Sequence, residues 1–212
     1  MTRLLGAHVH QAIPLAAAAL ERGALIAIPT ETVYGLVALP TESAIEGLMT
    51  AKQRSADKGI QLLVDSVVQA REFAVLTPAA EQLGATFWPG GLTLVVARRA
   101  DVTLPDSLGG GRPTLGIRLP DHEVPRALAR RLGPLAASSA NISGRPPATT
   151  AQMVVESLGD LLALVLDDGP VRGGVASTVV DCTTDPPKVV REGAIPAADI
   201  FAALGRDYTL AP

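Results

Sequence analysis

The sequence predicts an α/β fold, a single layered domain in which helices flank a twisted mixed sheet. Short apolar runs of strand length alternate with helical patterns along the chain, as is typical of layered α/β domains. Some neighbouring runs lie too close in the sequence for a crossover connection, so we expect antiparallel pairs as well as parallel ones. The 212 residues, 48% of them apolar, suffice for one sizeable core, and neither repeats nor a long linker divide them.

The first half of the chain is expected to contain four helices and four strands. Pro14 suits the first turn of the first helix, and Gly23 is placed to end it. Ser43 and Glu46 form an S-x-x-E capping box, which predicts the start of the second helix. The helical patterns cover residues 15–22, 43–51, 66–73 and 77–88. The runs that predict strands cover residues 24–28, 36–39, 60–64 and 92–97.

The second half begins with a glycine-rich loop at residues 101–113. Its three consecutive glycines, 109–111, are not followed by Gly-Lys-Ser/Thr, and no strand leads straight into them. We therefore predict a mobile hinge or lid segment at most, and no phosphate-binding loop. Strands are expected at residues 114–119, 135–137, 162–166, 178–181 and 188–191. Helices are expected at residues 124–132, 150–158 and 197–204, and a tail after them.

Bulk composition excludes several classes of protein. The net charge of −3 argues against nucleic-acid binding by the whole surface, although a locally basic cleft stays open. The single cysteine, Cys182, excludes an internal disulfide and is expected to be a small buried hydrophobe, and no Cys/His cluster has zinc spacing. No apolar run reaches membrane-spanning length and the N-terminus lacks a signal-peptide core, so we expect a cytoplasmic protein with no membrane contact.

Polar side chains gather where the predicted strands end. Taken singly, each cluster has a purely structural explanation. Lys52 and Arg54 could be a solvated helix end, and Arg118 could pair with Asp121 at the surface. The other clusters could satisfy turns or be ordinary strand residues. The groups at the strand ends are residues 30–34, Lys52, Arg54, Arg118, residues 138–141, Ser177, Thr178 and Arg191.

Together the clusters suit a ligand that carries phosphates and carboxylates. They are mostly cations and hydroxyls in a slightly acidic chain, and arginine forks match both anions. None of the three histidines lies inside a cluster, so we do not predict Ser139 to be a nucleophile. His122 is interpreted as a helix-start residue. No carboxylate pair has metal-ligand spacing, and Asp167-Asp168-Gly169 is interpreted as a turn.

Seven segments occur in the order and spacing of a known family. They are PTETVYGL (29–36), KQR (52–54), WPGGLTLV (88–95), LGIRLPDH (115–122), PLAASSANISG (134–144), ASTVVD (176–181) and VVREGAI (189–195). Over residues 12–196 the chain resembles the YrdC-type threonylcarbamoyl-AMP synthases. It is similar to the short form, which implies one YrdC-like catalytic domain over residues 1–212.

The resemblance implies a nucleotidyltransferase that condenses L-threonine, bicarbonate and ATP into threonylcarbamoyl-AMP and pyrophosphate. Mg²⁺ is expected on the phosphates, held mainly by ATP oxygens and water. The product would serve the threonylcarbamoyl-adenosine modification of tRNA, with a separate complex making the transfer. A direct contact with tRNA is a further expectation.

The resemblance also implies roles for individual residues. Threonine would be bound by Thr30, Arg118 and Ser177, with Tyr34 as a wall of the pocket. Lys52 and Arg54 are the expected catalytic cations. The expected nucleotide-binding residues are Lys52, Arg54, Thr114, Ser139, Asn141 and Arg191.

The sequence departs from the family at a few positions. Prolines usual in the family are replaced by Ser55, Gly59 and Gly91, and a usual serine by Pro147. We expect a more mobile loop after Arg54 and slightly weaker ATP binding. Two alternatives are an RNA-binding YrdC-like module and a carbamoyl-adenylate-forming domain. The first is disfavoured by the scarcity of aromatic residues for stacking, and the second by the absence of zinc-finger motifs.

Overall fold

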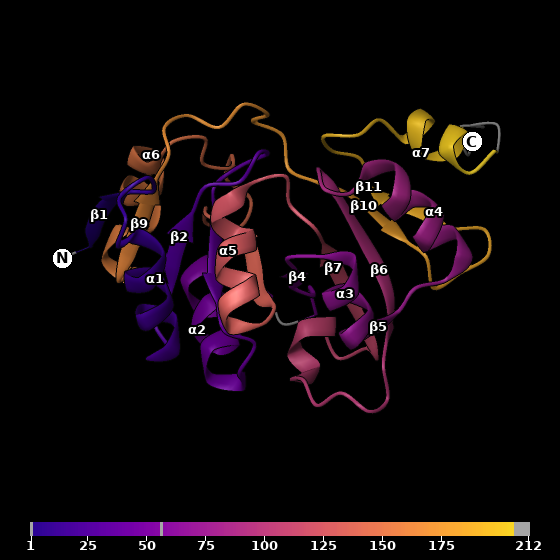
Figure 1. Cartoon of the computed structure of the whole chain (residues 1–212), viewed down its shortest axis with the longest axis horizontal. Helices are drawn as coiled ribbons and strands as arrows, with labels where there is room; N and C mark the ends of the chain where they lie inside the picture. The colour runs from indigo at the N-terminus through magenta and orange to yellow at the C-terminus, as the bar shows by residue number, and fades with distance from the viewer. Residues whose placement is uncertain (1, 56, 206–212) are drawn as a thin grey trace.

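A twisted mixed sheet spans the long axis of the molecule, with helices packed on its two faces (Figure 1). The computed structural model describes residues 2–55 and 57–205. The strand order in its eleven-stranded sheet is β1-β9-β2-β3-β8-β4-β7-β6-β10-β11, with β5 paired to β6. The predicted fold class is therefore confirmed. The predicted C-terminal tail lies outside the described residues.

The strands are β1 (Arg3–Gly6), β2 (Ile26–Ile28), β3 (Gly35–Ala38), β4 (Gln61–Leu63), β5 (Ala74–Val75), β6 (Leu92–Arg98), β7 (Thr114–Arg118), β8 (Leu135–Ser139), β9 (Leu164–Asp167), β10 (Thr178–Asp181) and β11 (Lys188–Arg191). The α-helices are α1 (Ala12–Glu21), α2 (Glu42–Lys52), α3 (Val67–Phe73), α4 (Pro78–Phe87), α5 (Glu123–Leu132), α6 (Ala151–Leu158) and α7 (Ala197–Ala203). Two 3₁₀ helices are η1 (Asp106–Gly109) and η2 (Gly159–Leu161). Strands β1 and β5 were not expected from the sequence.

The sheet contains antiparallel and parallel strand pairs, as expected because short connections can join only antiparallel neighbours. Strands β2 and β3 are antiparallel neighbours, as are β6 and β7. The pairs β1–β9, β4–β7 and β6–β10 are parallel. The antiparallel pairs β3–β8 and β4–β8 bring β8 to the middle of the sheet. The strands that carry the predicted polar clusters therefore lie in one continuous part of the sheet, from β2 to β11.

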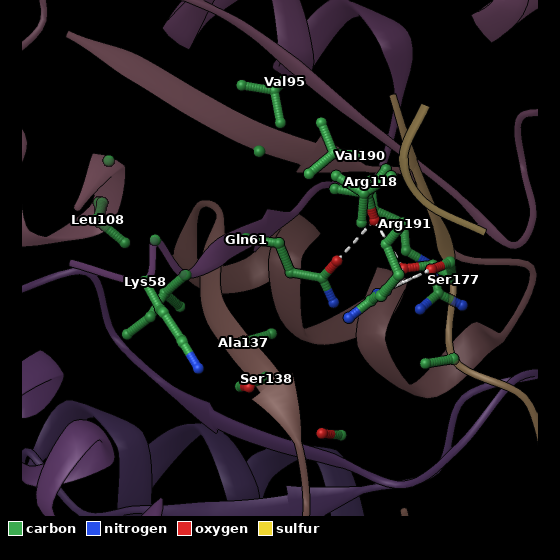
Figure 2. A pocket seen from close by; sticks show the side chains of 18 of the residues that line it. Lys58, Gln61, Val95, Leu108, Arg118, Ala137, Ser138, Ser177, Val190 and Arg191 are labelled. Carbon is green, nitrogen blue, oxygen red and sulfur yellow. Dashed lines mark hydrogen bonds between the residues drawn. The ribbon is translucent and has the colours of Figure 1, made fainter. Parts of the chain in front are cut away.

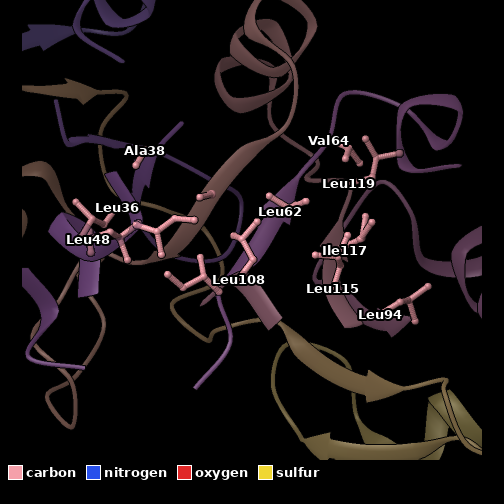
Figure 3. Packing of buried hydrophobic residues seen from close by; sticks show 14 of the residues in the cluster. Leu36, Ala38, Leu48, Leu62, Val64, Leu94, Leu108, Leu115, Ile117 and Leu119 are labelled. Atoms are coloured by element: carbon pink, nitrogen blue, oxygen red, sulfur yellow. The ribbon is translucent and has the colours of Figure 1, made fainter. Parts of the chain in front are cut away.

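Each face of the sheet buries its own core. Successive side chains of a strand point to opposite faces, so Leu36 and Ala38 of β3 join one core while Val37 joins the other. Helices α2, α4 and α6 supply the first core, and α1 and α5 the second. Leu48 of α2 and Leu62 of β4 are fully buried in the first core (Figure 3). Each such leucine contributes roughly 1.5–3 kcal/mol of stabilisation.

Helix starts agree with the sequence except at α2. The hydroxyl of Thr77 accepts from Ala80 N–H before α4, and His122 Nδ1 accepts from Val124 N–H before α5. The interpretation of His122 as a helix-start residue is thus confirmed. The capping box of Ser43 and Glu46 is wrong, because α2 begins one residue earlier, at Glu42, and Ser43 lies inside it.

The glycine-rich loop packs closely against the segment that precedes β4. Leu108 is fully buried, and its carbonyl accepts from Ile60 N–H at 2.8 Å. Gly110 has a φ of +64°, and a Cβ there would lie 2.4 Å from the carbonyl oxygen of Asp57. Only glycine fits such an approach. The loop thus completes a wall beside β4, and its predicted mobility stays a prediction. None of the described helices has the length and apolar character of a membrane span.

The cysteine gives a simple check of the core. Cys182 is 2% exposed, and burial, with Asp181 second, raises the pKa of its thiol to about 12. Since the thiolate is the nucleophile, we expect Ellman's reagent to leave the native protein almost unlabelled at about pH 8. The denatured chain should release one equivalent of dye for its one cysteine. Rapid stoichiometric labelling of the folded protein would contradict this packing.

Candidate functional site

A cavity of about 430 Å³ opens over the middle of the sheet (Figure 2). Strands β4, β6, β7, β8, β10 and β11 contribute to it, and so do the segment before β4 and the glycine-rich loop. Its lining is rich in polar groups. They are Arg54, Asp57, Lys58, Gln61, Thr93, Arg112, Thr114, Arg118, Ser138, Ser139, Ser177 and Arg191.

Ten residues were expected from the sequence to form the site, and the structure divides them. Those that line the one cavity are Arg54, Thr114, Arg118, Ser139, Ser177 and Arg191. They come from segments as far apart in the chain as the loop after α2 and strand β11, which the fold brings together. Those that lie behind the lining, all buried, are Thr30, Tyr34, Lys52 and Asn141.

Arg118 ends β7 and is 2% exposed. Its Nη2 donates to Glu31 Oε1 and to Thr32 Oγ1, each at 2.8 Å, and its Nε donates to the Gly90 carbonyl at 3.1 Å. The alternative that it pairs with Asp121 is therefore wrong. Sequence reasoning included Glu31 in the polar cluster at residues 30–34 but gave it no role of its own. Among the described residues its Oε2 is buried without a hydrogen-bond partner.

Thr30 shapes the turn that presents this partner of Arg118. Its hydroxyl donates to the Val33 carbonyl at 2.6 Å and accepts from the N–H groups of Thr32 and Val33 at 3.2 Å. Its oxygen also lies 3.0 Å from Thr32 Oγ1. Such local bonds are why threonine suits turns. Thr30 therefore acts on the cavity through Thr32 and Arg118.

Lys52 fastens α2 to the loop after β8. Its ammonium donates to the carbonyls of Ser139 and Asn141, the latter at 2.6 Å, and lies 3.4 Å from Asn141 Oδ1. The Asn141 amide in turn donates to the carbonyls of Ile142 and Arg145. Burial, with the charge of Arg54 second, lowers the pKa of Lys52 to about 8. Near neutral pH the ammonium thus stays mostly protonated and holds the Ser139 loop in shape.

Tyr34 directly precedes β3, and its hydroxyl contacts the end of β9 and the turn that follows it. Its hydroxyl lies 2.8 Å from the Gly169 carbonyl and 3.2 Å from Asp167 Oδ1. Burial raises its pKa to about 12. Asp167 Oδ1 accepts from Gly169 N–H, so the interpretation of 167–169 as a turn is confirmed.

His122 contacts the same turn, because its Nε2 lies 3.3 Å from Asp168 Oδ2.

The cavity concentrates positive charge. Arg191 donates from Nε and Nη2 to the Ser177 carbonyl at 3.2 and 2.7 Å, and Arg54 donates to the carbonyls of Lys58 and Gly59. Burial first, then the charges of Arg54 and Arg118, lowers the pKa of Arg191. The like charges therefore already oppose one another. An anionic ligand would relieve that repulsion.

Several lining residues were missed by sequence reasoning. Lys58 and Arg112 add two cations to the lining. The sequence could have indicated them, because Lys58 lies shortly after the KQR segment and Arg112 directly after the three glycines. Gln61 and Thr93 add neutral polar groups: Thr93 stands in the 88–95 segment but was given no role, and no motif marked Gln61. Within the described residues no group of three or more His, Cys, Asp or Glu side chains could hold a metal ion. Asp57 is the carboxylate in the described lining.

The family model Sua5/YciO/YrdC, described as telomere recombination, matches residues 18–193. A threonylcarbamoyl-AMP synthase of Pyrococcus abyssi is 40% identical over 196 residues, which cover 91% of this chain and 57% of that protein. A putative threonylcarbamoyl-AMP synthase of Mycobacterium tuberculosis H37Rv is 39% identical over 194 residues, covering 91% of this chain and 88% of that protein. The chain thus spans little over half the length of the archaeal relative.

Solved structures show the same arrangement of elements. P. abyssi Sua5 complexed with L-threonine superposes with a TM-score of 0.89 at 37% identity, over 98% of this chain and 62% of that chain. Escherichia coli YciO superposes with a TM-score of 0.81 at 23% identity, over 91% of this chain and 96% of that chain. The second likeness concerns the fold alone.

The two cations of the KQR segment should differ in their effect on stability. Lys52→Met leaves buried carbonyls of Ser139 and Asn141 without their donor, and should lower the free energy of unfolding by roughly 2–4 kcal/mol. Arg54→Met removes a half-exposed side chain, and should cost less than about 1 kcal/mol. Urea unfolding of both variants measures the difference. Equal losses would count against a structural clamp at Lys52.

His122 should make stability fall in mild acid. Its Nδ1 must be unprotonated to accept from Val124 N–H, and burial lowers its pKa below the ordinary 6.5 against the opposing charges of Asp168, Glu31 and Asp121. The unfolded chain therefore binds this proton more readily, and the contribution is lost as the pH falls below 6.5. His122→Asn keeps a cap but does not titrate. Its unfolding free energy should decline less steeply between about pH 7 and 5, and an unchanged slope would refute this.

Proposed function

The chain belongs to the Sua5/YciO/YrdC family, and on that premise we propose that it is an L-threonylcarbamoyladenylate synthase. It condenses L-threonine, bicarbonate and ATP into threonylcarbamoyl-AMP and pyrophosphate, and is thus a nucleotidyltransferase. The observation that carries the proposal is the convergence of six separated cationic and hydroxyl residues on one cavity. That cavity suits a ligand with both phosphates and a carboxylate.

The charges suggest how the two substrates lie. Arg118, at the end of β7, is the natural partner of the threonine carboxylate, with Ser177 beside it. Arg54, Lys58 and Arg191 offset the triphosphate. The hydroxyls that contact the nucleotide are those of Thr114 and Ser139. In this assignment Thr30, Lys52 and Asn141 act as positioning residues, and Tyr34 stabilises the turn after β9.

The reaction needs little covalent chemistry from the protein. The threonine amine adds to the bicarbonate carbon and water leaves, which gives a carbamate. A carbamate oxygen then attacks the α-phosphorus of ATP, and pyrophosphate leaves with the electron pair of the broken P–O bond. Positioning and charge stabilisation supply most of the rate in such a displacement. The cavity offers both, since it holds several fixed cations within 430 Å³.

Mg²⁺ fits this site as part of the ATP substrate. Asp57 is a lone carboxylate in the described lining, so the ion would be held by phosphate oxygens and water. The other expectations stay proposals. They are one catalytic domain over residues 1–212 with its core at 12–196, a cytoplasmic location, a downstream tRNA-modifying complex and a direct contact with tRNA.

Pyrophosphate release tests the proposal directly. With ATP, Mg²⁺ and bicarbonate, we expect release that depends on L-threonine and is much slower with L-serine or without an amino acid. Arg54→Met should lower kcat/KM at least about a hundred-fold, because it removes a cation from the phosphates.

Three outcomes would overturn the assignment. Release that is independent of threonine would show that the amino acid is not a substrate. Release that requires carbamoyl phosphate would favour the carbamoyl-adenylate alternative. Salt-sensitive RNA binding without any turnover would favour the binding-module alternative.

A further inference from the structure

Gln61 rises from a floor of small residues in the middle of the cavity. It begins β4, where its neighbours across the sheet are Gly116 of β7 and Ala137 of β8. A Cβ at Gly116 would lie 3.7 Å from Gln61 Cβ and 3.4 Å from Thr93 Cγ2. The two small neighbours therefore leave the Gln61 side chain room to extend into the cavity, as Figure 2 shows.

A hydrogen-bond chain fixes the direction of the Gln61 amide. Thr93 Oγ1 donates to Gln61 Oε1 at 2.7 Å, because an amide oxygen only accepts. Thr93 Oγ1 lies 2.8 Å from Ser177 Oγ, and with its own proton committed it accepts from that hydroxyl. Arg191 Nη2 donates to Ser177 Oγ at 3.3 Å. Each hydrogen bond in this series is thus donated in the direction of the Gln61 amide oxygen.

The amide nitrogen is left as a donor toward the ligand. It carries two N–H groups, and none of the described residues accepts a hydrogen bond from it. In Figure 2 the nitrogen is turned away from the bond to Thr93, toward the side of the cavity where Ser138 lies. The Gln61 amide is therefore a neutral hydrogen-bond donor in a cavity lined by several cations, and its orientation is fixed by the bond to its oxygen.

The position of β4 indicates which ligand atoms it meets. In the sheet β4 lies between β7, which carries Arg118, and β8, which carries Ser139. If Arg118 binds the threonine carboxylate and Ser139 lies near the nucleotide, the atoms between them are the carbon and oxygens that came from bicarbonate. We propose that the Gln61 amide donates to a carbamate oxygen and orients the carbamate for attack on the α-phosphorus. This inference rests on the proposed function.

A neutral donor suits that oxygen. The carbamate must keep one oxygen nucleophilic while its other oxygen is held in place. A guanidinium over both oxygens would lower the nucleophilicity of each, whereas a single N–H can hold one. The anchored amide also needs no reorganisation during the reaction, which is the condition under which such donors act.

Gln61→Met tests the inference, since methionine has a similar length but no N–H. We expect kcat for threonine-dependent pyrophosphate release to fall at least about ten-fold, with a raised KM for bicarbonate. The KM values for ATP and threonine should stay within about two-fold. Gln152→Met is the matched control, because Gln152 lies on the exposed face of α6 and bonds only Glu156 in the described structure. It should behave as the wild type.

A second variant separates a donor from mere shape. Gln61→Glu can still accept from Thr93, but its second oxygen donates only when the carboxyl is protonated. Its rate relative to wild type should therefore rise as the pH falls, and this readout does not depend on how well the methionine variant folds.

The possible failures are distinguishable. A wild-type enzyme without threonine-dependent release would overturn the proposed function itself. With that activity present, the Gln61 inference is overturned by any of three results. They are an unchanged kcat and bicarbonate KM in Gln61→Met, an effect confined to the KM of ATP or threonine, and a pH-independent rate ratio for Gln61→Glu.

Discussion

The site depends on cations that are held by backbone carbonyls and not by carboxylates. Arg191 is bound to the Ser177 carbonyl, Arg54 to those of Lys58 and Gly59, and Lys52 to those of Ser139 and Asn141. A carbonyl oxygen satisfies a donor without cancelling its charge, whereas a carboxylate would neutralise it. The cavity of an acidic chain therefore stays positive. Arg118, which pairs with Glu31, is the exception among these cations.

Keeping these cations together without an anionic ligand costs folding free energy. Partial burial lowers the pKa values of Lys52, Arg54 and Arg191, and neighbouring arginines lower those of Lys52 and Arg191 further, so the folded protein bears part of the cost of desolvating these cations. The two apolar cores on either face of the sheet offset this cost. An anionic ligand adds the missing counter-charge, and ligand binding should stabilise the fold by mass action.

The sequence predicted the sheet and much of the cavity lining, but not which way side chains point. Strands and caps follow from local patterns, and Arg54, Arg118 and Arg191 stand where strands or helices end. Lys52 belongs to the same short segment as Arg54, yet α2 continues through Lys52 and turns at Gln53, whose φ of +51° redirects the chain. Because of this turn at Gln53, the Lys52 side chain is buried against backbone carbonyls, whereas the Arg54 side chain lines the cavity. Glu31 and Gln61 depend on partners far along the chain, which no local pattern reveals.

The residues that replace the family's usual prolines at 55 and 59 allow a different way of restraining the cavity wall beside β4. Prolines at 55 and 59 would stiffen the loop after Arg54, and their loss was expected to loosen it. A Cβ at Gly59, however, would lie 2.9 Å from the Leu108 carbonyl oxygen, so this glycine allows the glycine-rich loop to approach. The bond from Ile60 N–H to that carbonyl then joins the two segments. Close packing between segments can thus do what restricted backbone angles do elsewhere, because either one limits the conformations open to the loop.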